Sequence, residues 1–141
     1  MASAPGQAPS PDVERALGSI RTMVLVALIF AIIGTILELV LLGYVIFLGV
    51  AISKLGVAGQ AASAELGFIG FLLLVFLIID VLVIRRTSKM YSAAKNGDVA
   101  TLKSLNSLGW AIVALIFAGV VAGVLLLIAY GSINNLPSPQ V

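Results

Sequence analysis

Three long apolar runs constrain this chain more than any other feature of its sequence. They cover Met23–Ser53, Leu66–Ile84 and Gly109–Tyr130. At a rise of about 1.5 Å per residue, roughly 20 residues are enough to cross the hydrocarbon core of a bilayer. The composition agrees, because 61% of the residues are hydrophobic and only 10% are charged. We therefore expect an all-α, polytopic integral membrane protein.

The first run leaves the number of crossings open. It is too long for one upright crossing and too short for two crossings with a turn, although a break near Gly43 is an alternative. We predict three membrane helices, spanning about residues 23–50, 66–84 and 109–130. They belong to one helical membrane domain, 11–135, that starts at the Ser10-Pro11 helix signal. Residues 1–10 and 136–141 are expected to form disordered tails.

The basic residues orient these spans. With the N-terminus inside, only Lys54 is external, and the other basic residues are cytoplasmic: Arg15, Arg21, Arg85, Arg86, Lys89, Lys95 and Lys103. Splitting the first run into two crossings would move Arg15 and Arg21 outside and weaken this bias. The positive-inside rule therefore favours a multi-pass protein of the cell membrane with a cytoplasmic N-terminus and, after three crossings, an external C-terminus.

The two connections between the runs differ. Lys54–Gly67 is rich in small residues and is expected to be an external loop or a weak helix. The inner connection contains Asn96-Gly97-Asp98, in which Asn or Gly ends one helix and Asp98 caps the next. We therefore expect the last two spans to extend about ten residues past the membrane and to form a helical hairpin with a basic tip.

Glu38 is a lone acid in the middle of the first run. A central charged residue costs about 2.5 to 3.5 kcal/mol on insertion scales, which the surrounding Leu, Ile, Val and Phe residues outweigh. Glu38 is therefore expected to insert, and to be protonated because no Lys or Arg lies within a span. Three interpretations stay open: a proton or cation site at a helix interface, a carboxyl group bonded to Thr35, Tyr44 or a neighbouring chain, or one near the outer headgroups if the span is Met23–Leu42.

Asp80 lies about one turn inside the inner end of the second run. Arg85, Arg86 or Lys89 could fold back towards it, which favours an interfacial ion pair. Because Glu38 and Asp80 lie on antiparallel helices, we expect them at different depths. Whether the two carboxyl groups meet is left open by the sequence.

The third run carries a ribbon of small residues. Gly119 and Gly123 form a G-x-x-x-G pattern, and the ribbon as a whole is predicted to be a helix-packing face: Ala111, Ala114, Ala118, Gly119, Ala122 and Gly123. The packing partner is another span of this chain or another copy of it. Trp110 and Tyr130 lie near the two ends of the run, where interfacial aromatic residues are expected.

The basic hairpin tip is a candidate for surface contacts. Its five basic residues, Arg85, Arg86, Lys89, Lys95 and Lys103, could bind anionic lipid headgroups or an acidic partner. They are also what the positive-inside rule requires of a cytoplasmic loop. We do not expect nucleic acid to be a partner.

The chain contains no cysteine and no histidine. This composition excludes disulfides, thiolate nucleophiles, the common zinc ligand sets and histidine-ligated haem. The serine residues have no histidine to activate them, and no phosphate-binding glycine pattern occurs. We therefore expect neither an enzyme nor a cofactor or metal site.

Residues 88–122, with the Gly97-Asp98 pair, Trp110 and a small-residue final span, resemble the second half of the dispanin family, which includes the interferon-induced transmembrane proteins. The chain lacks the cysteine pair that those proteins carry before the loop and has an additional long first helix. The resemblance implies a small membrane protein with a basic inner loop, and it transfers no functional residues.

Three functions are compatible with these features. We expect a non-enzymatic structural or accessory membrane subunit that associates through helix packing with the lipid bilayer, with copies of itself or with the subunits of a larger complex. The first alternative is an oligomer that conducts protons or cations through Glu38. The second is a polymerising, pilin-like subunit with a basic loop.

Overall fold

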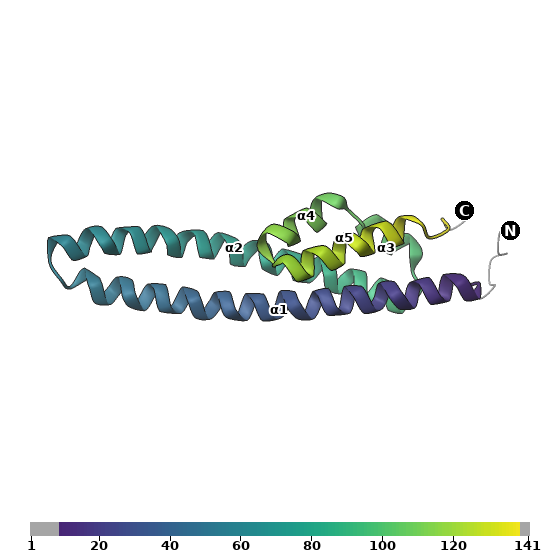
Figure 1. Ribbon diagram of the computed structural model, residues 1–141, viewed down its shortest axis with the longest axis horizontal. Helices are drawn as coiled ribbons and strands as arrows, with labels where there is room; N and C mark the ends of the chain where they lie inside the picture. Colours follow the sequence, from purple (N-terminus) through teal and green to yellow (C-terminus); the bar gives the residue numbers. More distant parts are fainter. Residues whose placement is uncertain (1–8, 139–141) are drawn as a thin grey trace.

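A long antiparallel helical hairpin forms the frame of the molecule (Figure 1). The computed structural model describes residues 9–138. The hairpin consists of α1, Pro11–Ser53, and α2, Val57–Lys95. Three shorter helices follow and pack along one part of it: α3, Val99–Leu105, α4, Leu108–Phe117, and α5, Val120–Asn134. The all-α prediction is confirmed for the described residues.

The helix α1 is continuous through Gly43, so the first apolar run is one helix and the alternative break is absent. Its start at Pro11, with Asp12 and Glu14 in the first turn, agrees with the sequence signals, although the Ser10 side chain forms no capping hydrogen bond. Forty-three residues rise about 64 Å, which is longer than the 40 to 45 Å of a bilayer with its headgroups. The helix α1 is therefore longer than a single bilayer crossing requires.

The connection between α1 and α2 is much shorter than expected. The predicted loop or weak helix, Lys54–Gly67, is helical from Val57 onwards, so only Lys54, Leu55 and Gly56 join the two helices. Gly56 has a φ of 79°, a left-handed conformation that favours glycine. This short turn fixes the register in which α1 and α2 face each other.

The Asn96-Gly97-Asp98 prediction is confirmed. The helix α2 ends at Lys95, Gly97 has a φ of 68°, and a carboxylate oxygen of Asp98 accepts a hydrogen bond of 2.9 Å from the backbone N–H of Thr101. The hydrogen bonds from Thr101, first that of its side chain and then that of its backbone, hold the pKa of Asp98 below its usual value. One helix stops and the next starts within three residues, as these residue types favour.

The third apolar run differs from its prediction as one helix over 109–130. It forms two helices, α4 and α5, that separate at Ala118-Gly119, where Gly119 has a φ of 101° and a ψ of 156°. This conformation is accessible essentially only to glycine. After this turn the chain folds back on itself. The Asn106 side chain donates hydrogen bonds to the backbone carbonyl of Tyr130 at 3.1 Å and to the Asn134 side chain at 3.0 Å. The start of α4 and the end of α5 are therefore neighbours.

The buried residues divide the α1–α2 hairpin into two halves. In the terminal half, residues 11–34 and 81–95, α4 and α5 cover α1 and α2 (Figure 1). The turn half, residues 35–53 and 57–80, consists of α1 and α2 alone, apart from the α4–α5 turn that reaches it at Phe76, whose ring lies 4.9 Å from that of Phe117. Both ends of the described chain lie at the end opposite the α1–α2 turn.

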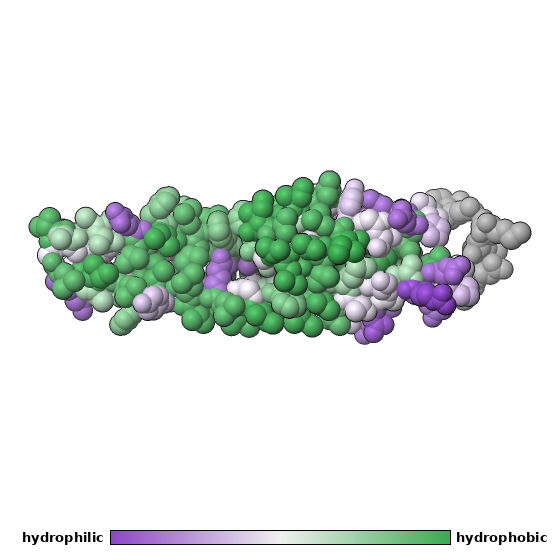
Figure 2. Space-filling model, viewed as in Figure 1, coloured by the Kyte–Doolittle hydropathy of each residue, from purple (hydrophilic) through white to green (hydrophobic). Residues whose placement is uncertain are grey.

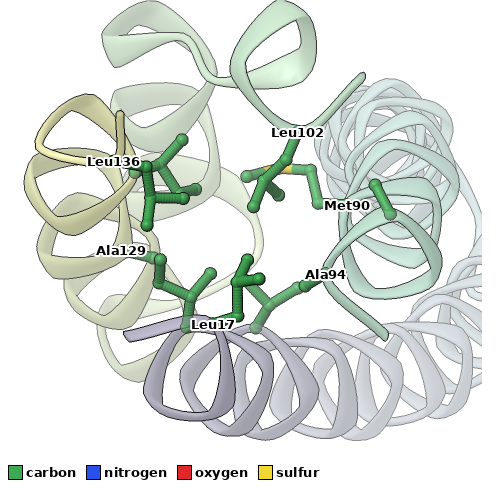
Figure 3. Packing of buried hydrophobic residues seen from close by; sticks show 10 residues of the cluster. Leu17, Met90, Ala94, Leu102, Ala129 and Leu136 are labelled. Carbon is green, nitrogen blue, oxygen red and sulfur yellow. The ribbon is translucent and has the colours of Figure 1, made fainter. Parts of the chain in front are cut away.

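Two clusters form the core of the terminal half. The cluster nearest the chain ends contains Leu17, Met90, Leu102 and Ala129, and Figure 3 shows these residues of α1, α2, α3 and α5 around one centre. Leu136, the first residue of the predicted C-terminal tail, is also buried there. Residues 139–141 of that tail and residues 1–8 of the N-terminal tail lie outside the described residues. The second cluster is rich in alanine and lies further along α1.

Large apolar side chains cover the outside of the molecule. They include Val40 and Phe47 of α1, Phe68 and Ile78 of α2 and Ile116 of α4, each more than half exposed. Figure 2 shows this apolar surface over most of the visible face, with hydrophilic residues concentrated at the end that holds the chain ends. Within the described residues, two helices are long and apolar enough to cross a membrane, or up to three if α3 and α4 count as one bent span.

Candidate functional site: an intramembrane carboxyl pair

The structure brings Glu38 and Asp80 together. Gly49 of α1 faces Leu66 of α2, and Gly70 faces Val45, so the short turn sets one antiparallel register along the hairpin. In that register Asp80 lies opposite Thr35, one turn before Glu38, which places the two carboxyl groups close enough to interact. The prediction that these acids lie at different depths is therefore wrong. The prediction failed because it assumed a long connection between α1 and α2, which leaves the register of the two helices undetermined.

Asp80 is enclosed rather than interfacial. Only 2% of its surface is exposed, whereas Glu38 is partly buried. Figure 2 shows a small hydrophilic patch midway along the molecule between α1 and α2, surrounded by apolar surface. Two acids therefore share one apolar interface near the middle of both long helices.

The predicted ion pair of Asp80 is absent, because one of its carboxylate oxygens contacts Thr35 and the other has no partner within the described residues. Arg86 turns towards the other side of α2. Two of its nitrogens donate to the Leu105 carbonyl oxygen at 3.1 and 2.7 Å, and its guanidinium carbon lies 5.3 Å from the centre of the Trp110 ring. These contacts hold Arg86 against α3 and α4, so its charge is used away from Asp80.

Thr35 connects the pair to the backbone of α1. Its hydroxyl oxygen lies 2.9 Å from the Ala31 carbonyl oxygen and 3.4 Å from Oδ2 of Asp80. A hydroxyl group has one proton but can accept further hydrogen bonds. When its proton goes to Ala31, the contact with Asp80 is a hydrogen bond only if Asp80 carries a proton. Thr35 can therefore donate a hydrogen bond to ionised Asp80 or accept one from protonated Asp80.

Two buried oxygen atoms at the site lack a partner. They are Oε2 of Glu38 and Oδ1 of Asp80, and neither has a hydrogen bond within the described residues. An ionised carboxylate can only accept, so two facing carboxylates cannot satisfy each other. One proton between them supplies the missing donor and removes the repulsion between like charges. The arrangement therefore suits a pair that shares a proton.

The turn between α4 and α5 reaches α1 beside this pair. The carbonyl oxygen of Ala118 lies 3.5 Å from the position that a Cβ atom on Gly34 would occupy, and Gly34 is one helical turn before Glu38. Glycine at this position lets the end of α4 approach the backbone of α1 closely. The α4–α5 turn thereby closes one side of the site.

The predicted packing residues are used inside the chain. Ala111, Ala114, Ala118 and Ala122 are each at most 5% exposed and pack in the alanine-rich cluster with residues of α1 and α2. A Cβ atom on Gly123 would lie 2.2 Å from the Cα atom of Leu115, so Gly123 permits contact between α5 and α4. Gly119 forms the turn itself. The ribbon is a packing face, and its partners are helices of the same chain.

The predicted basic residues lie at the end of the molecule that holds the chain ends. Arg85, Lys89 and Lys95 are exposed, whereas Arg86 is bonded to Leu105 and Lys103 donates to the Ser138 hydroxyl at 3.2 Å. Three of the five predicted basic residues are therefore exposed for contacts outside the chain.

Sequence reasoning missed the pairing of Thr35 with Asp80. The signal that could have found it is Gly56, because a glycine turn directly after α1 sets residues 35 and 80 opposite each other. Among the described residues, no group of three or more His, Cys, Asp or Glu side chains could hold a metal ion. Comparisons of the chain with protein-family models, curated proteins and solved structures found no match.

Proposed function

We propose that this chain is a non-enzymatic multi-pass membrane protein that takes up and releases a proton at the Glu38–Asp80 pair. The observation that carries the proposal is the proximity of two carboxyl groups, each with an unpartnered buried oxygen atom, in an apolar helix interface. Acidic residues inside a membrane bundle are costly, and they commonly mark proton or ion pathways. With two carboxyl groups and one hydroxyl, the site offers few oxygen ligands for a multivalent cation.

Proton flux into vesicles tests this function. The purified protein is reconstituted into vesicles that contain a pH-sensitive dye. We expect the vesicle interior to acidify when a membrane potential is imposed. Glu38→Gln and Asp80→Asn keep the shape of each side chain but remove its acid, so each should reduce the flux to the rate of protein-free vesicles. Glu65→Gln removes an exposed acid of α2 and serves as the matched control. Equal flux from wild type and Glu38→Gln would rule the function out.

The proposal includes a topology. The basic end of the hairpin, which carries the N-terminus, faces the cytoplasm, and Lys54 at the α1–α2 turn faces outside. The ten residues of α4 rise about 15 Å, half of the roughly 30 Å of hydrocarbon. The fold supports a re-entrant α4–α5 hairpin in place of a third crossing, with a cytoplasmic C-terminus in place of the external one expected from sequence. The charges do not distinguish these alternatives, since no Lys or Arg follows Lys103.

Single-cysteine labelling tests the topology cleanly, because the chain has no cysteine of its own. We expect Ser10→Cys and Ser138→Cys to react with an impermeant maleimide from the same side of the cell membrane. Leu55→Cys, which is 73% exposed at the α1–α2 turn, should react from the opposite side. Labelling of Ser138→Cys and Leu55→Cys from the same side would instead show that the third apolar run crosses the membrane.

A structural or accessory role in an oligomer is the second candidate. One observation favours it: Glu38 is only partly buried, and a carboxyl group facing lipid gains from contact with a neighbouring chain. The exposed Arg85, Lys89 and Lys95 would then face anionic headgroups or an acidic partner. The mass of the complex in mild detergent tests this role, and a monomer without co-purifying proteins would exclude it.

A further inference from the structure

An apolar groove runs along the turn half of the hairpin. It has a volume of about 420 Å³ and lies between α1 and α2, lined by Leu42, Val45, Gly49, Ser63, Gly67 and Phe71 among others. On the α1 side it extends from Leu42 to Ser53, a rise of about 16 Å, which matches one leaflet of a bilayer. The groove does not include the carboxyl pair.

The groove continues a seam that is filled elsewhere. In the terminal half, α4 and α5 cover the contact between α1 and α2, with Ala114 and Ala122 at most 1% exposed. In the turn half no helix of the described chain takes that place, and Gly67 has no atom within 4 Å of where a Cβ would lie. The same seam is thus closed by protein at one end and open at the other.

The length and the apolar lining of the groove suit a single chain of methylene groups, which has no polar group to satisfy. The two serine hydroxyls are already used, since Ser53 donates to Val50 at 2.8 Å and Ser63 donates to Gln60 at 2.9 Å. The groove therefore presents apolar surface to its occupant.

A single positive charge lies at the open end of the groove. Lys54 directly follows Ser53, is exposed, and is the one basic residue between Arg21 and Arg85. A phospholipid whose acyl chain lies along the groove would bring its phosphate to the level of this side chain. We propose that the groove binds one acyl chain of an outer-leaflet phospholipid, with the headgroup beside Lys54.

Lipid retention tests the groove. The protein is purified in mild detergent from membranes of phosphatidylcholine and phosphatidylglycerol, and bound lipid is counted by native mass spectrometry. A Cβ atom on Gly67 would have no atom within 4 Å, so Gly67→Leu places an apolar side chain in the groove, and lipid occupancy should fall by about tenfold. Gly43→Leu is the matched control, because Gly43 is equally open, lies on the same hairpin and does not line the groove.

Three results would overturn the proposal. Equal occupancy in Gly67→Leu and wild type excludes the groove as the binding place, and equal loss in Gly43→Leu makes the effect nonspecific. A wild-type dimer that Gly67→Leu converts to a monomer identifies a second copy as the occupant.

A photoreactive lipid tests the same site in the wild-type chain, so the outcome does not depend on the folding of a variant. A phosphatidylglycerol with a diazirine on its acyl chain should crosslink to peptides within 42–53 and 63–74. Lys54→Gln should remove the preference for this anionic lipid over phosphatidylcholine while the acyl chain still binds. Crosslinks confined to other segments would contradict the assignment. The proton-flux variants leave the groove unchanged, so the two proposals fail independently.

Discussion

The two halves of the α1–α2 hairpin differ in what covers the contact between α1 and α2. In the terminal half, alanine side chains such as Ala114 and Ala122 allow α4 and α5 to lie against α1 and α2. In the turn half, Gly49 and Gly67 face a groove that no helix of the described chain fills. Small residues therefore mark close packing only where a second element is present to use them.

The carboxyl pair lies where these two halves meet. The α4–α5 turn reaches α1 at Gly34 and α2 at Phe76, on either side of the level of Glu38 and Asp80. A polar pair in an apolar interface is stable only if its surroundings satisfy or neutralise it. The α4–α5 turn is therefore part of the surroundings of the pair.

Gly123→Leu should have the largest effect on stability, because it disrupts the packing of α4 and α5 that covers the terminal half. A Cβ atom there would lie 2.2 Å from the Cα atom of Leu115, and a backbone atom cannot move aside. We expect a loss of at least about 3 kcal/mol in the free energy of unfolding. Thermal unfolding in detergent measures it. Gly131→Ala, with open space around it on the same helix, is the control and should be neutral or slightly stabilising.

This result would also change how an oligomer is tested. The G-x-x-x-G pattern by itself suggests replacing Gly119 and Gly123 together to test a packing face between copies. In this fold both glycines maintain the monomer, so loss of association in that variant would report misfolding. An unfolding midpoint of Gly123→Leu equal to that of wild type would instead show that α4 and α5 do not fold back on each other.

Gly119→Ala should have the next largest effect. Its φ of 101° and ψ of 156° cost a residue with a side chain about 1 to 3 kcal/mol. Because no atom lies within 4 Å of the added Cβ, the cost comes from the backbone alone. Gly18→Ala, at an open helical position of α1, controls for the substitution itself. Similar unfolding midpoints for both variants would mean that the turn at Gly119 is not formed.

Thr35→Val should have a smaller effect, confined to the boundary between the halves. It removes the hydroxyl that lies 3.4 Å from Asp80 but keeps the shape of the side chain, so we expect a loss of about 1 kcal/mol. Infrared spectroscopy should show a shift in the carbonyl band of a protonated carboxyl group, and this band should disappear in Asp80→Asn. Thr35→Ser, which keeps the hydroxyl, should leave the band in place. An unchanged band in Thr35→Val would show that the Thr35 hydroxyl does not interact with the carboxyl pair.

The sequence predicted the local features of this fold well. Apolar run length identified the long helices, and Gly97-Asp98 located the end of α2 and the start of α3. These features depend on a few neighbouring residues. The same reasoning placed the C-terminal helices in one straight span, because nothing in composition distinguishes a glycine that packs from a glycine that turns.

The carboxyl site could be predicted only in part. Glu38 and Asp80 were identified as candidate acids because a charge inside an apolar run is visible in sequence. Their contact depends on the register of α1 against α2, which a connection of three residues sets. Arg85, Arg86 or Lys89 was expected to fold back towards Asp80, but Arg86 bonds to the carbonyl of Leu105, a residue 19 positions away. Long-range pairings of this kind are not encoded in local spacing.

Asp98 gives the smallest predicted effect, a local change in the terminal half that should leave the turn half unaltered. Its hydrogen bonds from Thr101 lower the pKa of its carboxyl group. A lowered pKa means that the folded chain favours the ionised form, so the cap contributes fully above the usual aspartate pKa, near 4. The contribution is lost as the pH falls through the lowered value. Hydrogen exchange of the Thr101 N–H should accelerate, relative to its intrinsic rate, over that acidic range. Asp98→Asn, which caps without titrating, should show no such change, and identical pH profiles for the two proteins would contradict the assignment.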